Sequence, residues 1–300
     1  DSGVETFKGT PIKSLAREIC QNSLDAALEN GKPTHIEFKT FDIDPRKIPD
    51  YSSLEDALKR ALDFWSQQQS TKAKNFFKQA LAVIHKPTIT CLRISDFNTS
   101  GLVGSREEYN SPWCNLTKSS GASDKSGSHG GSFGIGKFAP YACSALRTVF
   151  HSTNDKDGVC ASQGVSRLTS FKNKKNEITQ GTGFYGNDKN SPMYKQYSLD
   201  PAYSRSADNS GTDIFIVAFN GDSGWQHQMV ASVLDGFLYA IYNETLVVDV
   251  DGTVICKDSL ADLMISHKEY FNEHADEYYQ TLTDENVART FTKEFTDDSE

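Results

Sequence analysis

The chain has 300 residues, of which 37% are hydrophobic and 24% are charged, so it can bury a sizeable core in one large domain or two ordinary ones. Its formal net charge of −9 argues against a surface that coats nucleic acid, although a local basic patch remains compatible with it. Six isolated cysteines without C-x-x-C spacing exclude the common zinc and redox motifs and predict a cytoplasmic protein, and the lack of a long apolar run excludes a membrane span.

Hydrophobic periodicity and turn residues predict alternating helices and strands. The expected elements, in chain order, are a helix (11–30), a strand (34–43), a helical hairpin (51–86), a strand (88–95), a long polar loop (99–131), a helix (137–146), two strands (146–153 and 159–171), a turn-rich stretch (172–210), a strand (213–219), a helix (225–242), a β-hairpin (246–256) and an acidic helical remainder. The aromatic stripe of the helical hairpin indicates core packing.

The first segment that carries chemistry is the predicted helix containing Glu18, Asn22 and Asp25. At about 100° per residue, their spacing places the three side chains within a sector of roughly 60°. One face therefore offers a base, an amide oxygen and a second carboxylate, a set that suits a divalent ion and a water beside a phosphate. A solvated amphipathic helix explains the same pattern when it is considered alone.

A second segment begins where the strand 88–95 delivers Asp96 to a loop. A carboxylate there would accept a hydrogen bond from the exocyclic amine of adenine, whereas guanine presents a carbonyl that would repel it. Gly101 would let the backbone approach a ligand closely. Thr212 follows a glycine at the start of a later strand and would lie near Asp96 and adenine. Taken alone, a strand-ending Asp is also typical of a turn or a helix cap.

A third segment, residues 127–137, is rich in glycine, which lets successive backbone amides point at phosphate oxygens where a helix begins. Lys137 would supply a further donor. The segment is not a P-loop, because Phe138 stands where that motif needs Ser or Thr. It is not a dinucleotide fingerprint either, because it follows a polar loop instead of a strand. A flexible loop without a ligand is the alternative interpretation.

Together and in this order, these segments resemble the GHKL superfamily of ATPases, which includes DNA gyrase, the ninety-kilodalton heat-shock chaperone, histidine kinases and MutL. Three of its motifs are matched at their fixed positions: E-x-x-x-N-x-x-D-A by Glu18, Asn22, Asp25 and Ala26, G-x-x-G-x-G by Gly131, Gly134 and Gly136, and Gly-Thr by Gly211 and Thr212. The likeness spans roughly residues 10–220.

The fourth motif, D-x-G-x-G, departs from the family pattern. Asp96 is kept, but Asn98 replaces the first glycine and Gly101 comes late. Asn tolerates left-handed backbone better than most residues, so Asn98 would imitate the missing glycine.

The resemblance implies an α/β (α+β) two-layer sandwich of the Bergerat type, with a mixed β-sheet covered by helices. It implies that Glu18 acts as the general base, that Asn22 binds Mg²⁺ and that Asp25 supports the site beside the adenine. The remaining expected ATP-binding residues are Asp96, Asn98, Gly101, Gly131, Ser132, Phe133, Gly134, Ile135, Gly136, Lys137 and Thr212. Residues 51–86 form a helical insertion, and residues 101–133 form a mobile lid over ATP.

The expected domains are an ATP-binding domain over residues 1–221 and a helical and hairpin extension over 222–300 that begins a coupling domain. The missing initial Met and the acidic end predict a piece of a larger protein. The resemblance implies Mg²⁺-dependent ATP hydrolysis that drives lid closure and pairing of two copies, in nucleic-acid processing or defence, with nucleic acid or an effector protein bound by other regions. A histidine-kinase-like or non-hydrolytic ATP-sensing module is the alternative, and a scaffold without nucleotide is a third.

Overall fold

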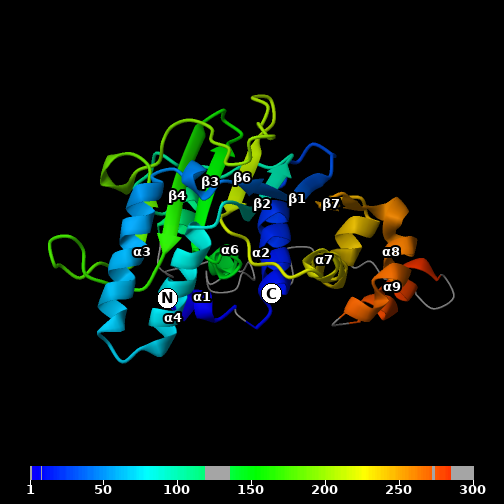
Figure 1. Ribbon diagram of the computed structural model, residues 1–300. Helices are drawn as coiled ribbons and strands as arrows, with labels where there is room; N and C mark the ends of the chain where they lie inside the picture. Colours follow the sequence, from blue (N-terminus) through cyan, green and yellow to red (C-terminus); the bar gives the residue numbers. More distant parts are fainter. Residues whose placement is uncertain (1, 8, 119–135, 272–273, 285–300) are drawn as a thin grey trace, which may run out of the picture.

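The computed structural model describes residues 2–7, 9–118, 136–271 and 274–284, which form an α/β fold around one mixed sheet (Figure 1). The sheet has eight strands in the order β5-β4-β3-β6-β2-β1-β7-β8. It is mixed because β1 and β7 run parallel, whereas the other neighbouring pairs are antiparallel. The strands are β1 (Thr34–Ile43), β2 (Ile89–Phe97), β3 (Thr148–Asn154), β4 (Cys160–Arg167), β5 (Thr182–Tyr185), β6 (Gly211–Ile216), β7 (Leu246–Val250) and β8 (Thr253–Ile255).

Helices cover both faces of this sheet. The α-helices are α1 (Ser2–Glu5), α2 (Pro11–Asp25), α3 (Tyr51–Ser66), α4 (Thr71–Ile84), α5 (Pro112–Thr117), α6 (Ala139–Ala142), α7 (Trp225–Tyr242), α8 (Leu260–Ser266) and α9 (Ala275–Thr283). Figure 1 shows the hairpin α3–α4 on the left of the sheet and α8 and α9 on the right. The expected helical hairpin is confirmed, and it forms a partial third layer beside the two expected layers.

Alternation along the central strands supplies two large apolar cores, one on each face of the sheet. Leu92 and Ile94 of β2 point to the face covered by α2, α6 and α7, where they join the first core. Cys91 of β2 and Phe215 of β6 point to the opposite face and pack with the α3–α4 hairpin. Successive strand residues point to opposite faces, so one strand supplies both cores. The face under α2 also carries the predicted site residues Asp96 and Thr212.

The helix α2 ends at Asp25 instead of continuing to residue 30 as expected. The chain beyond it pairs with the segment after β2: the backbone N–H of Leu28 donates to Asn98 O, and the N–H of Ser100 donates to Ala26 O. These bonds replace the next helical turn. They also fasten the end of α2 to the residues that follow Asp96.

The helix expected over residues 137–146 is shorter, because only a 3-10 turn (Gly136–Phe138) and the four-residue α6 form there. The Ser144 hydroxyl donates to Val217 O at 2.5 Å and accepts from the N–H groups of Leu146 and Thr148. A serine that bonds the backbone in this way offers an alternative to the helix ladder, and the chain turns into β3.

The segment after the expected boundary at residue 221 joins the same sheet and core. Helix α7, found where the sequence predicts it, packs against α2, and β7 pairs with β1. The expected β-hairpin forms, with Asp251 and Gly252 in its turn. The stretch 172–210, expected to lack regular structure, supplies the edge strand β5.

Among the described residues, no helix combines the length and apolar character needed to cross a membrane.

Candidate functional site

Asp96 stands at the centre of a hydrogen-bonded cluster that joins three elements. Its Oδ1 accepts from the backbone N–H of Thr212 at 2.7 Å and from the Thr99 hydroxyl at 2.8 Å. Its Oδ2 accepts from the Ser23 hydroxyl of α2 at 3.1 Å. The structure therefore brings together the helix of the first motif, the end of β2 and the Gly-Thr pair of β6. Burial raises the pKa of Asp96 above its usual value of 3.8, while these hydrogen bonds and Arg205 act against that rise.

Gly211 allows the strands to meet at this point. Its φ is 151°, and a Cβ there would overlap the carbonyl oxygen of Asp96 and contact Arg205. Behind it, the guanidinium of Arg205 donates to both carboxylate oxygens of Asp213, at 2.7 and 2.9 Å. Both side chains are buried, and Arg205 also donates to Thr212 O at 3.1 Å. This ion pair fixes the backbone of β6 that contacts Asp96.

Asn98 and Gly101 hold the backbone after Asp96. Asn98 has a φ of 60°, the left-handed conformation that the expected replacement of a glycine requires. Its side-chain amide donates to the carbonyl oxygens of Lys32 and Pro33, so it is occupied by the loop before β1. Gly101 has a φ of 63°, and a Cβ there would lie 2.8 Å from Asn154 O. Contacts within the protein therefore account for the presence of Asn at position 98 and of Gly at position 101.

Replacing Asn98 with Ala should lower the free energy of unfolding by about 1–3 kcal/mol, because it removes hydrogen bonds and leaves a side chain in left-handed backbone. Urea denaturation measures the change. Asn98→Gly should cost less, because glycine adopts this conformation readily. Asn110 is the matched control, since its φ is 56° and its side chain makes no hydrogen bond with the described residues. Equal losses in Asn98→Ala and Asn110→Ala would contradict a role for the side-chain bonds.

Glu18 lies two turns before the end of α2, directly against the backbone of Gly136. A Cβ on Gly136 would overlap the Glu18 carboxylate, so any residue other than glycine at this position would require the Glu18 side chain to move. The Asn22 amide donates to Glu18 Oε1 at 3.0 Å, which shows that the two side chains share a face of the helix. The first motif and the end of the glycine-rich segment are therefore adjacent in space.

Positive charge gathers beside Glu18. Lys137 is buried and its ammonium donates to Asn115 O of α5 at 3.1 Å. Burial and the nearby Arg167 lower the pKa of Lys137, while Glu18 acts in the opposite direction. The guanidinium of Arg167 packs over the rings of Phe138 and Tyr141, at 4.8 and 5.1 Å from their centroids. Two cationic side chains and one carboxylate thus surround the start of α6.

The second carboxylate of the first motif, Asp25, is exposed at the end of α2. It accepts from the Gln21 amide of its own helix at 2.8 Å, whereas Ser23 makes the contact with Asp96. The predicted residues Gly131, Ser132, Phe133, Gly134 and Ile135 lie outside the described residues. The described residues contain no group of three or more His, Cys, Asp or Glu that could hold a metal by themselves.

Sequence reasoning missed Ser23, Thr99 and Arg167. Ser23 occupies the buried stripe of α2 with Ile12, Leu15, Ile19 and Cys20, and a hydroxyl in an apolar stripe is a usable signal for a polar partner. Thr99 is buried three residues after Asp96, the spacing of a local side-chain contact. Arg167 ends the strand β4 far along the chain, and no local pattern connects it to Glu18.

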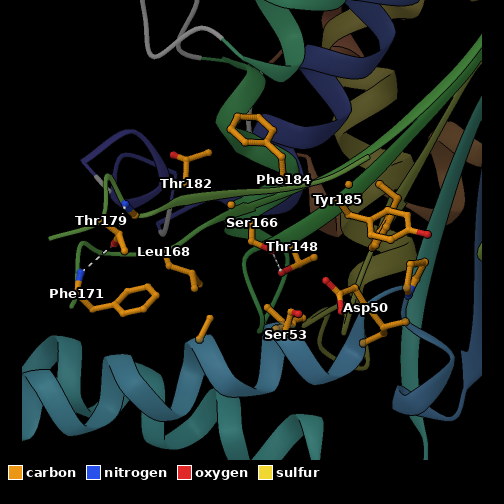
Figure 2. Close-up of a pocket in the computed structure, with 18 residues that line it drawn as sticks. Asp50, Ser53, Thr148, Ser166, Leu168, Phe171, Thr179, Thr182, Phe184 and Tyr185 are labelled. Carbon is orange, nitrogen blue, oxygen red and sulfur yellow. Dashed lines mark hydrogen bonds between the residues drawn. The ribbon is translucent and has the colours of Figure 1, made fainter. Parts of the chain in front are cut away.

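Two cavities formed by described residues lie away from this cluster. One lies between α3 and the strands β3, β4 and β5 (Figure 2), and the other lies beside Trp225 at the start of α7. Neither is lined by a predicted site residue. The candidate site is therefore defined by its contacts around Asp96 and Glu18.

Comparison of the sequence with protein-family models found no match, and comparison with curated proteins found none either. The function is therefore inferred from the residues of the site.

Proposed function

We propose that this protein binds ATP with Mg²⁺ and hydrolyses it, in the manner of the GHKL ATPases that its motifs resemble. The observation that carries the proposal is the placement of α2. Ser23, near its end, donates to Asp96, while Glu18, more than one turn earlier, lies against Gly136. One helix thus links the predicted adenine contact to the end of the glycine-rich segment.

The residues around Asp96 fit an adenine. An ionised carboxylate offers about four acceptor sites, and three are used by Ser23, Thr99 and Thr212. The remaining site suits the exocyclic amine of adenine. The three protein donors fix the carboxylate in place, so little reorganisation is needed on binding.

The residues on the exposed face of α2 fit a magnesium nucleotide. The Asn22 nitrogen is engaged by Glu18, which leaves the amide oxygen as the group available to a cation. Bound Mg²⁺ would neutralise phosphate charge. Glu18 would accept a proton from the attacking water, with its orientation held by Asn22. Lys137 and Arg167 would attract the phosphates.

Calorimetry with Mg-ATP, followed by assays for free phosphate and for phosphorylated protein, tests the proposal. Binding with release of free phosphate is the expected result. Stable label on the protein with little free phosphate would instead support the kinase-like alternative. No heat of binding, together with no displacement of a fluorescent ATP analogue, would support a scaffold that does not use nucleotide.

The proposal includes pairing of two copies when ATP is bound, which the family resemblance supports. Light scattering should give the mass of one chain without nucleotide and about twice that mass with a non-hydrolysable ATP analogue. An unchanged mass at saturating analogue would remove pairing from the proposal and leave ATP binding standing.

A further inference from the structure

A separate cavity lies on the opposite side of the sheet from Asp96. The cavity between α3 and the strands β3, β4 and β5 has a volume of about 240 Å³ (Figure 2). A cavity of about 150 Å³ already accommodates benzene in other proteins. The space is therefore sufficient for a compact organic molecule. Because the cavity is separate from the proposed ATP site, a ligand could occupy it whether or not the chain binds ATP.

The walls of this cavity are mostly apolar and include aromatic rings. Phe150 of β3 belongs to the core shared with the α3–α4 hairpin, and Leu168 and Phe171 are buried beside it. Figure 2 shows Leu168 and Phe171 between the sheet and α3. Gly164 of β4 leaves room for Phe150, because a Cβ at Gly164 would lie 2.5 Å from that ring. An apolar ligand part would fit against these side chains.

Gly183 leaves one wall open. It lines the cavity in β5, and a Cβ there would meet no atom within 4 Å. Its neighbour Tyr185, two residues along the strand, packs into the core on the same face as the hairpin. A side chain added at Gly183 would therefore enter this space without displacing a neighbour.

Two hydroxyl groups in the cavity present acceptors. The Thr148 hydroxyl donates its proton to Leu146 O at 3.0 Å. The contact of 2.8 Å between Thr148 Oγ1 and Ser166 Oγ must then use the Ser166 proton. Neither hydroxyl keeps a proton for a ligand, and Ser166 offers lone pairs. The pair thus favours a ligand that donates hydrogen bonds.

The charge on the cavity lining is negative. Asp50 is the one charged residue among the eighteen that line it. It precedes α3 with a φ of 52°, and its carboxylate neither caps that helix nor pairs with a cation among the described residues. In Figure 2 it faces Thr148 and Ser166. A carboxylate beside aromatic rings and hydroxyl acceptors is suited to an organic cation.

We propose that this cavity binds a compact apolar amine, with the ammonium group at Asp50 and the hydrocarbon part against Phe150 and Phe171.

Titration of the full chain without nucleotide, followed by ligand-observed NMR, tests this with three probes of the same shape. They are phenethylammonium, neutral 2-phenylethanol and anionic 3-phenylpropionate. Phenethylammonium should bind best, and 3-phenylpropionate should bind least because its charge is repelled by Asp50.

Two variants locate the binding. Asp50→Asn should weaken phenethylammonium binding only about two- to five-fold, because Asp50 is exposed to solvent, and should bring it level with 2-phenylethanol. Gly183→Leu should abolish binding by filling the cavity. The matched controls are Asp63→Asn on the exposed side of α3 and Gly236→Leu in α7, where a Cβ also meets no atom within 4 Å. Neither control should change binding.

The proposal is overturned if phenethylammonium does not bind the wild-type chain, or if Gly183→Leu binds it as well as Gly236→Leu does. Equal binding of all three probes would overturn the assignment of an amine. Thermal melting of each variant distinguishes a filled cavity from a misfolded chain, because Gly183→Leu should melt within a few degrees of the wild type.

Discussion

Replacing Glu18 with Gln should leave Mg-ATP binding intact and lower ATP turnover by about 100- to 10,000-fold. The substitution keeps the shape of the side chain and its contact with Gly136, and its amide oxygen can still accept from Asn22. It removes only the capacity to take a proton from water. Binding measured by calorimetry and turnover measured by phosphate release separate these two effects.

Glu29→Gln is the matched control, because Glu29 is an exposed carboxylate shortly after α2 that lies outside the proposed site. It should retain both binding and turnover. Normal turnover in Glu18→Gln would remove Glu18 from the role of base. Loss of binding in Glu18→Gln would instead assign this side chain to holding the phosphate end of the site.

The elements that the sequence predicts well are those with a long local period. The strand expected over residues 34–43 and the helix expected over 225–242 have these bounds in the structure. The first segment alternates over its first five residues and is rich in strand-forming residues, and the second is an apolar helix of eighteen residues, so the local sequence of each favours one kind of element. The hairpin α3–α4 is predicted for the same reason, because its apolar residues repeat over four turns or nearly so.

The elements that the sequence predicts poorly are decided by distant partners. The helix α2 stops early because residues after Asp25 bond to the backbone around Asn98, more than seventy positions later. The edge strand β5 has four residues and includes Gly183, so it lacks the alternation that marks a strand. Its presence depends on pairing with β4.

In the candidate site, too, the sequence predicts the local contacts well and the contacts between distant segments poorly. The helical spacing predicts that Glu18 and Asn22 share a face, and their hydrogen bond agrees with this. Only the order of the motifs predicts the approach of Thr212 to Asp96, because β2 and β6 are far apart in the chain. Arg167 lies beside Phe138, at the Glu18 end of the site, because of the place of β4 in the sheet. No single segment of the sequence predicts that strand order.

Replacing Asp96 with Asn should weaken ATP binding by at least about 100-fold while leaving the fold intact. The Asn oxygen can occupy the position of Oδ1 and accept from Thr212 and Thr99. Its amide can then donate to the Ser23 hydroxyl, which reverses the direction of that bond. The protein contacts survive, but the ionised acceptor for the adenine amine is lost. Calorimetry gives the affinity, and urea denaturation verifies that stability is maintained.

The Asp96→Asn variant should also abolish the pH dependence of ATP affinity that comes from Asp96. Burial raises the pKa of Asp96, so the folded chain binds this proton more tightly than the unfolded chain does. The cost of burying the carboxylate is therefore present above the folded pKa and is relieved as the pH falls through it. ATP affinity should change in the opposite sense, weakening as the pH falls, because the base contact needs the ionised group. In Asp96→Asn the residual affinity should stay flat over that range. An equal fall in both proteins would assign the pH dependence to another group and remove Asp96 from the adenine contact.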